Sequence, residues 1–187
     1  MRVYIGARAE DGTVKLSKMG GSDWTRAKSK AKSAVKDIAE KLIKLYAERQ
    51  RTVGYSFPPD SELEDEFAAD FEFIETEAQA QAIEEIKADM MKPVPMNRLL
   101  CGDVGFGKTE VALRAAFKAI MGGKQVAILV PTTILALQHY ETALSRMRGY
   151  PVTVEMLSRF RTPKEQARIT EEVKRGKVDI LIGTHKL

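Results

Sequence analysis

A run of eight residues from Gly102 to Thr109 has the types and spacing that suit phosphate binding. Its sequence, Gly-Asp-Val-Gly-Phe-Gly-Lys-Thr, fits the pattern G-x-x-x-x-G-K-[S/T] at every required place. Glycines let the backbone wrap closely, so that inward-facing N–H groups and the start of the next helix form a nest for anions. In this pattern Lys108 contacts the β- and γ-phosphates and the Thr109 hydroxyl coordinates Mg²⁺. The sequence therefore predicts a site for ATP and Mg²⁺ formed by Gly102, Asp103, Val104, Gly105, Phe106, Gly107, Lys108 and Thr109.

A second polar pattern lies upstream, between Phe73 and Gln79 (Phe-Ile-Glu-Thr-Glu-Ala-Gln). The side-chain amide of Gln79 offers both a donor and an acceptor, which suits the edge of an adenine base. Thr76 and Gln79 also have the spacing of a capping box, in which Gln79 satisfies only the start of its own helix. The residues alone leave these two interpretations open.

The elements that position these residues follow two patterns. Before residue 97 we expect helices at 25–50, 62–70 and 77–90 and a short strand at Val14–Leu16; the first helix has one apolar face and one rich in lysine. From residue 97 onward short apolar runs alternate with helical segments. Strands are expected at 98–101, 125–130, 152–157 and 178–182, and helices at 108–121, 133–147 and 163–175. This alternation predicts an α/β fold with a parallel sheet.

Composition limits the alternatives. A length of 187 residues allows one ordinary domain with an appended element, and a net charge of +4 is only weak evidence for a nucleic-acid partner. No apolar run is long enough for a membrane span or a secretory signal, so no membrane partner is expected. The single cysteine, Cys101, fits a reducing cytoplasm and is expected to be buried at a strand end. Neither His139 nor His185 has a partner at metal-ligand spacing, so no zinc site is expected.

Several longer stretches resemble the first motor lobe of the bacterial transcription-repair coupling factors (Mfd), which are superfamily 2 double-stranded DNA translocases. They are GDVGFGKTEVA and LRAAFKAI at 102–120, LVPTTILALQHY at 129–140, LSRFR at 157–161 with KEQ at 164–166, and DILIGTHKL at 179–187. KMGGSDW at 18–24 and DIAEKLIKLYAE at 37–48 resemble the helix that joins the polymerase-interacting region of that family to its motor. RecG, a branched-DNA helicase, is the nearest alternative, but its lobe usually has Ser in place of Phe106 and lacks this upstream helix.

The resemblance implies a domain plan and further site residues. It makes 1–24 the remnant of the upstream region, 25–52 the connecting helix, 53–72 a linker with a short acidic helix, and 73–187 a RecA-like ATP-binding lobe that ends before an acidic Asp-Glu-Glu-Gln motif. It assigns Phe73 and Gln79 to adenine. It assigns DNA-backbone contacts to Pro131, Thr132, Thr133, Gly183, Thr184 and His185, and Arg159 and Arg161 add positive charge beside them.

The function implied by the resemblance is ATP-driven translocation on duplex DNA, which displaces stalled RNA polymerase and begins repair in the cytoplasm. Contacts with polymerase and repair proteins would come from regions absent from this chain. The acidic motif and the arginine fingers of a second lobe are also absent, so the chain alone is expected to bind nucleotide with negligible turnover. A RecG-like lobe and a non-catalytic nucleotide- or DNA-binding module remain the alternatives.

Overall fold

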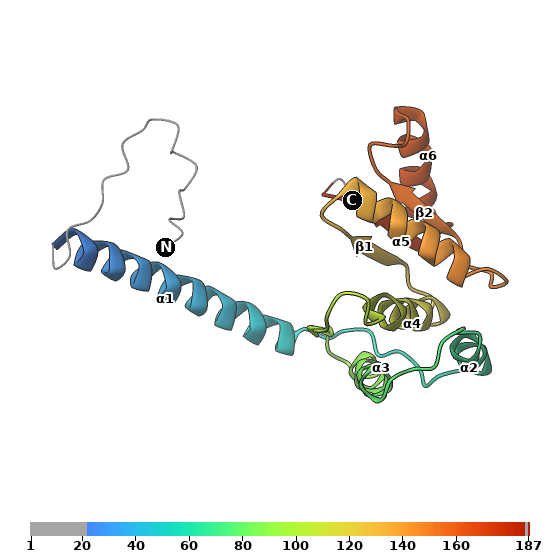
Figure 1. Ribbon diagram of the computed structural model, residues 1–187, viewed down its shortest axis with the longest axis horizontal. Coiled ribbons are helices and arrows are strands. Elements are labelled where there is room, and N and C mark those ends of the chain that lie inside the picture. Colours follow the sequence, from blue (N-terminus) through green and yellow to red (C-terminus); the bar gives the residue numbers. More distant parts are fainter. Residues whose placement is uncertain (1–21, 186) are drawn as a thin grey trace. The chain divides into compact units, whose positions relative to one another are not determined.

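The computed structural model describes residues 22–185 and 187. The strand expected at Val14–Leu16 and most of the 1–24 segment therefore lie outside the described residues. The chain divides into two compact units, Met1–Arg51 and Thr52–Leu187. The described part of the first unit is one helix, α1 (Ser22–Arg51), which confirms the helix predicted at 25–50 (Figure 1).

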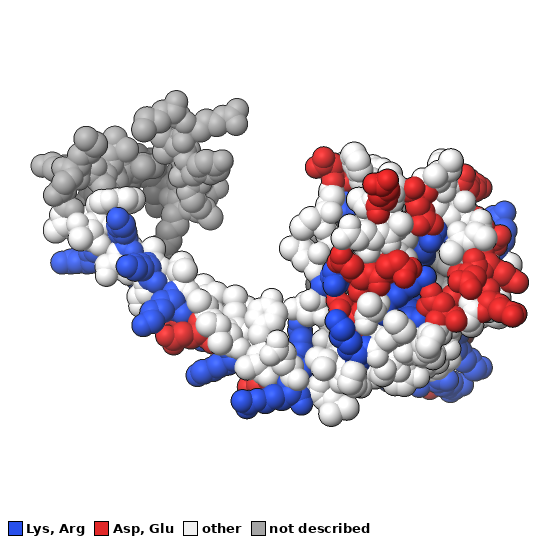
Figure 2. Space-filling view, turned by 90° about the horizontal axis from the view of Figure 1, so that it is seen from below, with Lys and Arg blue, Asp and Glu red and all other residues white. Residues whose placement is uncertain are grey.

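Helix α1 is polar on one side and apolar on the other. Its sequence contains neither glycine nor proline and is rich in Ala, Lys and Glu, which favour helix. Figure 2 shows several Lys and Arg side chains along this helix. The apolar side chains of the predicted stripe are exposed, at 65% for Val35, 57% for Ile38 and 46% for Leu42.

The second unit contains five helices and three strands among its described residues. The helices are α2 (Glu62–Ala69), α3 (Glu77–Met90), α4 (Lys108–Met121), α5 (Thr133–Arg146) and α6 (Pro163–Lys174). The strands are β1 (Val126–Leu129), β2 (Val154–Leu157) and β3 (Ile180–Gly183). Capping boxes begin α2, α3 and α6, and α6 also has Pro163 at its first helical position.

The sheet is parallel, with the strand order β1-β3-β2. Ile180 of β3 lies level with Val126 of β1 and Val154 of β2, and all three side chains face a core that α4 and α5 also line. The opposite face carries Glu155, which pairs at 2.9 Å with Arg168 of α6. Figure 1 shows α5 and α6 flanking the strands. This confirms the predicted α/β fold with helices on both faces of a parallel sheet.

The strand predicted at Arg98–Cys101 is wrong: the segment has no regular secondary structure and belongs to no ladder among the described residues. Leu100 packs against the cluster of Ile83 and Ile86, whereas Leu99 is 85% exposed. A strand needs a neighbour for its main-chain N–H and C=O groups, and apolar content alone does not supply one. Cys101, expected to be buried, is exposed for the same reason.

Candidate functional site

The phosphate-binding pattern forms a tight loop immediately before α4. Gly105 and Gly107 have φ values of 84° and 66°, and no other type of residue has a positive φ in the described part of the chain. Gly107 is the N-cap of α4, so Lys108 and Thr109 are the first two residues of the helix. A Cβ at position 107 would lie 2.3 Å from Nε2 of Gln79. The left-handed dihedral angle therefore favours glycine, and a Cβ here would also displace the Gln79 amide.

Lys108 lies across the loop that precedes it. Its Nζ donates hydrogen bonds to the main-chain oxygens of Gly102 at 2.7 Å and Asp103 at 2.6 Å. Thr109 follows, half-buried, in the first turn of α4. An ammonium group thus sits beside a helix N-terminus, where unpaired N–H groups and the helix dipole favour an anion. The arrangement is chemically suited to hold phosphate groups.

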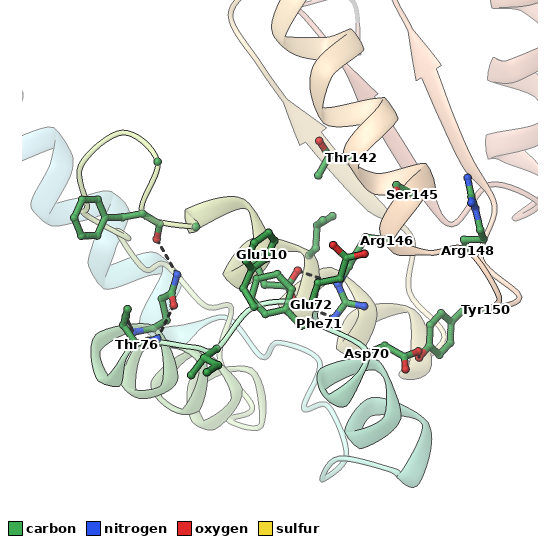
Figure 3. Close-up of a pocket in the computed structure, with 17 residues that line it drawn as sticks. Asp70, Phe71, Glu72, Thr76, Glu110, Thr142, Ser145, Arg146, Arg148 and Tyr150 are labelled. Carbon is green, nitrogen blue, oxygen red and sulfur yellow. Dashed lines mark hydrogen bonds and ion pairs between the residues drawn. The ribbon is translucent and has the colours of Figure 1, made fainter.

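Gln79 has two roles in the structure. Its Oε1 accepts the main-chain N–H of Thr76 at 2.8 Å, while Oγ1 of Thr76 accepts the N–H of Gln79 at 3.3 Å (Figure 3). The capping-box interpretation is therefore confirmed. In addition, Nε2 of Gln79 donates to the main-chain oxygen of Phe106 at 3.1 Å. This second bond, which the sequence analysis did not predict, joins the start of α3 to the phosphate loop.

A cavity of about 940 Å³ opens beside these two segments. One wall consists of Phe73, Ile74, Thr76 and Gln79, and another of the loop residues 105–107. Phe73 is 71% exposed, so its ring is available to a ligand. Figure 3 shows that α5 and the residues after it form the far side, with Thr142, Ser145, Arg146, Arg148 and Tyr150. None of these five was predicted as a site residue.

Four charged side chains form a network behind the cavity wall. Glu110 accepts hydrogen bonds from Arg114 at 2.9 Å and from Arg146 at 2.9 and 3.0 Å. Arg114 also pairs with Glu75 at 2.5 Å. The side chains of Glu110, Arg114 and Arg146 are only 8%, 7% and 12% exposed. The sequence offered one signal, since Glu110 and Arg114 are oppositely charged residues four apart in α4.

Lys118, in the last turn of α4, forms an ion pair with Asp60. Burial alone would raise the pKa of Asp60, but hydrogen bonds and charge attraction from Lys118 and Lys87 outweigh it and hold that pKa below its usual value. The ammonium of Lys118 lies 2.5 Å from Asp60, and the Lys118 side chain is 2% exposed.

Tyr150 lines the cavity and donates a hydrogen bond to Asp70 at 2.5 Å. Burial, together with this hydrogen bond, raises the pKa of Tyr150 to about 12. Tyr150 therefore stays neutral at the cavity rim.

The predicted DNA-contact residues follow the carboxyl ends of the three strands. Leu129, Gly183 and Leu157 lie level with one another at these ends, so the segments after them share one edge of the sheet. Thr132 is exposed and its Oγ1 accepts the N–H of Leu135 at 3.2 Å, which makes it the N-cap of α5. The remaining members at this edge are Pro131 and His185, exposed, Thr133, half-buried, and Gly183 and Thr184, buried.

The two predicted arginines differ in environment. Arg159 is exposed, with its guanidinium 5.8 Å from the ring centroid of Phe160. Arg161 is half-buried and lies 3.8 Å from both Glu155 and Glu165. Its Nε is buried without a hydrogen-bond partner. Arg159 therefore offers its charge to an outside partner more readily than Arg161 does.

No group of three or more His, Cys, Asp or Glu side chains is arranged to hold a metal ion among the residues that the structure describes. No helix within residues 22–185 combines the length and apolar character needed to cross a membrane.

Comparison with solved structures places this fold among helicases. The structure of RecG bound to a three-way DNA junction matches with a TM-score of 0.73 and 40% identity, over 77% of this chain and 20% of that chain. A hypothetical ATP-dependent RNA helicase from Sulfolobus tokodaii matches with a TM-score of 0.50 and 19% identity, over 67% of this chain and 34% of that chain. The second match shows a shared fold alone.

Comparison with curated proteins confirms the resemblance drawn from the sequence. The transcription-repair-coupling factor of Bacillus subtilis (strain 168) is 57% identical over 184 residues, which is 98% of this chain and 16% of that protein. The protein of the same name from Staphylococcus aureus (strain USA300) is 58% identical over 179 residues, 96% of this chain and 15% of that protein. Residues 76–187, more than half of the chain, match the DEAD/DEAH box helicase family. The chain belongs to the DEAD/DEAH box helicase family.

Proposed function

We propose that this chain is the ATP-binding portion of an ATP-dependent double-stranded DNA translocase that acts in transcription-coupled repair. The observation that carries the proposal is the loop at Gly102–Thr109, in which Gly107 caps α4 at a φ of 66° and Lys108 lies across the loop. High identity to transcription-repair-coupling factors over nearly the whole chain supports the cellular role. The chain spans 16% of the first of these relatives, so activity and partners of the whole protein belong to the proposal.

The phosphates of ATP would bind the loop, with the Lys108 ammonium on the β- and γ-phosphates and loop N–H groups around them. Thr109 is the residue that would hold Mg²⁺ together with the nucleotide, and a bound Mg²⁺ would neutralise developing charge on the phosphates. Thr109 is half-buried at the helix start beside Lys108, a position that fits this role.

The base would lie against the cavity wall formed by Phe73 and Gln79. Because Gln79 is anchored both to Thr76 and to Phe106, its amide has a fixed orientation next to the phosphate loop. The exposed ring of Phe73 offers an aromatic face for the base. Base and phosphates would thus be held by adjacent segments whose relative position is set by a hydrogen bond.

The sequence contains no Asp-Glu-Glu-Gln run to supply the carboxylate that holds the metal and orients the attacking water. Stabilisation of the charge that develops on a transferred phosphoryl group in the transition state depends on such positioned groups. An arginine finger alone is worth about 10³–10⁵ in rate. We therefore expect this chain to bind nucleotide without appreciable hydrolysis.

The DNA backbone would lie along the carboxyl edge of the sheet. Thr132 and His185 are exposed there, and Arg159 adds a positive charge. Hydroxyl groups, helix N-termini and guanidinium groups all bind phosphates without reading base sequence, which suits a motor that moves along DNA. RNA polymerase and repair proteins would be contacted by other parts of the whole protein.

A RecG-like activity on branched DNA is the second candidate, because the match to RecG extends over 77% of the chain. A DNA-binding comparison separates the two. Equal affinity of the chain for a linear duplex and for a three-way junction of the same length favours the translocase, and a clear preference for the junction favours RecG-like function.

Nucleotide binding is tested by equilibrium titration of ADP with Mg²⁺ into the chain. Saturable binding that Lys108→Ala weakens supports the proposal. A folded chain that binds no ADP would contradict it.

A further inference from the structure

We propose that Arg114 is a positioning residue for the base of the nucleotide. Held by Glu110, it fixes the segment 71–79 against α4 and so sets affinity for adenosine independently of affinity for phosphate. This inference rests on the proposed function, nucleotide binding at Gly102–Thr109. The network was not predicted from the sequence, and it joins elements that the nucleotide would otherwise have to bring together by itself.

Arg114 belongs to the same helix that begins at the phosphate loop. Its side chain is 7% exposed, and its Nε donates to Glu110 at 2.9 Å, one turn nearer the loop. A guanidinium has its donors in a rigid planar fork, so a bond through Nε fixes where the other nitrogens point. The guanidinium of Arg114 is therefore held in a fixed position relative to α4 and to the loop that precedes it.

The guanidinium of Arg114 faces the segment 71–79, which carries the residues proposed to contact the base. One terminal nitrogen of Arg114 lies 2.5 Å from Oε1 of Glu75. Glu75 directly precedes Thr76, whose N–H donates to Gln79. The guanidinium of Arg114 is buried, so loss of the Glu75 charge would leave it poorly compensated. The pair thus restrains the residue next to the capping box that orients Gln79.

Arg114 also touches the aromatic part of the same segment. Its guanidinium carbon lies 5.6 Å from the ring centroid of Phe71, and that of Arg146 lies 5.7 Å from it. The Phe71 ring packs edge-on to Phe73 at 5.5 Å between centroids. Cations near the ring hold it by cation–π attraction, so Phe73 is supported through Phe71. Arg114 therefore positions both residues proposed to contact the base, Phe73 and Gln79.

Glu110 anchors this arrangement from the opposite side. It accepts two hydrogen bonds from Arg146 of α5 in addition to the one from Arg114. Two carboxylates, Glu75 and Glu110, and two guanidinium groups balance each other within the network. Because each charge has a partner, removal of one member leaves another poorly compensated. Figure 3 shows Glu110 and Arg146 facing one another at the back of the cavity.

A network that only stabilised the fold would affect all ligands alike, and this gives the test. ADP and inorganic pyrophosphate, each with Mg²⁺, are titrated into the wild-type chain, Glu75→Gln and Arg114→Lys. Glu75 is partly exposed, at 29%, so its substitution should leave the chain folded. The matched control is Glu172→Gln, which breaks another Glu–Arg pair, with Arg168 at 2.5 Å, on α6.

We expect Glu75→Gln and Arg114→Lys each to weaken the affinity for ADP on the order of tenfold. Each should change the affinity for pyrophosphate by less than about twofold. The double variant should lose no more ADP affinity than the more affected single variant, because both changes break the same Arg114–Glu75 ion pair. The control should leave both affinities unchanged. Equal losses for ADP and pyrophosphate, or no loss for either, would overturn the proposal.

Amide hydrogen exchange supplies a readout that needs no ligand. Glu75→Gln should raise exchange at Thr76, Gln79 and Ala80, whose N–H groups are hydrogen-bonded at the start of α3, while residues 84–90 keep their protection. If the wild-type chain binds neither ADP nor pyrophosphate, the proposed function fails, and exchange then decides the inference alone. Unchanged exchange at these three residues would show that the pair does not position the segment 71–79.

Discussion

Nε2 of Gln79 lies 3.1 Å from the main-chain oxygen of Phe106, so the residue that caps α3 also holds the phosphate loop. The same side chain accepts the N–H of Thr76 through its other terminal atom. A single amide thereby links the two segments proposed to bind base and phosphate.

Gln79→Glu separates the two roles of this side chain. A glutamate keeps the acceptor for the Thr76 N–H and is equally suited to a capping box, but it cannot donate to Phe106. We expect the free energy of unfolding to change by less than about 0.5 kcal/mol and ADP affinity to fall about tenfold. Urea denaturation and calorimetry measure the two. Gln79→Ala serves as the comparison and should also lose about 1 kcal/mol of stability with the cap.

Gly107→Ala tests the geometry of the loop. The change forces a side chain into a φ of 66° and toward Nε2 of Gln79, 2.3 Å from the new Cβ. Gly123→Ala is the matched control, since Gly123 has a φ of 72° with open space around it. We expect the control to lose about 1 kcal/mol of stability from the dihedral angle alone and to bind ADP normally.

The variant at position 107 should lose at least as much stability as the control. It should bind ADP more weakly by an order of magnitude or more, because the new Cβ displaces the Gln79 amide from Phe106 and alanine resists the left-handed φ of the loop. Thermal denaturation and titration with ADP compare the two variants. Normal ADP binding by Gly107→Ala would mean that the contact with Gln79 is not part of the binding geometry.

Asp60 predicts a pH dependence of stability. Burial alone would raise its pKa, but Lys118 and Lys87 outweigh burial and hold the pKa of Asp60 in the folded chain below its usual value. A carboxyl whose folded pKa is depressed stabilises the fold above its unfolded pKa, and that contribution is lost as the pH falls through the folded value. We expect wild-type stability to fall below about pH 4 more steeply than that of Asp60→Asn.

Urea denaturation at a series of pH values measures this difference. Glu141→Gln, at an exposed carboxyl on α5, is the control and should keep the wild-type slope. Parallel curves for wild type and Asp60→Asn would contradict the role of the Asp60–Lys118 pair. At neutral pH Asp60→Asn should be less stable than wild type, because it leaves Lys118 buried beside a neutral partner.

Arg159→Ala tests the proposed DNA edge. If Arg159 contacts a phosphate, its loss should weaken duplex binding similarly for different sequences and reduce the slope of log affinity against log salt by about one. Arg175→Ala, which removes an exposed arginine paired with Glu171 at the end of α6, is the control and should leave the slope unchanged. Fluorescence anisotropy with a labelled duplex at several salt concentrations gives both values. Identical slopes for the two variants would remove Arg159 from the DNA contact.

The parts of the fold predicted well have local causes. The bounds of α4, Lys108–Met121, match the prediction because the loop glycine and the following helix formers act within a few residues. Helix α6 begins at Pro163 for the same kind of reason, a capping box with proline at the first helical position. Such signals depend only on neighbouring residues, so the sequence alone reveals them.

The parts that were missed depend on partners far away in the chain. Arg98–Cys101 is apolar enough for a strand but has no ladder neighbour among the described residues. Arg146 reaches Glu110 across 36 positions, and Gln79 reaches Phe106 across 27. Spacing rules describe one helix or one strand at a time and cannot show such contacts. The phosphate loop was therefore predictable, whereas the network that supports the base side was not.

The most direct test of the central claim is a calorimetric titration of ADP with Mg²⁺ into the chain, Lys108→Ala and Lys164→Ala. Lys108 bonds to Gly102 and Asp103 within the loop, whereas Lys164 is an exposed residue near the start of α6. Circular dichroism confirms that each variant is folded. We predict saturable binding for wild type and Lys164→Ala, with affinity at least about tenfold weaker for Lys108→Ala. Absence of binding by the folded wild-type chain, or equal binding by Lys108→Ala, would contradict the claim that Gly102–Thr109 is a nucleotide site.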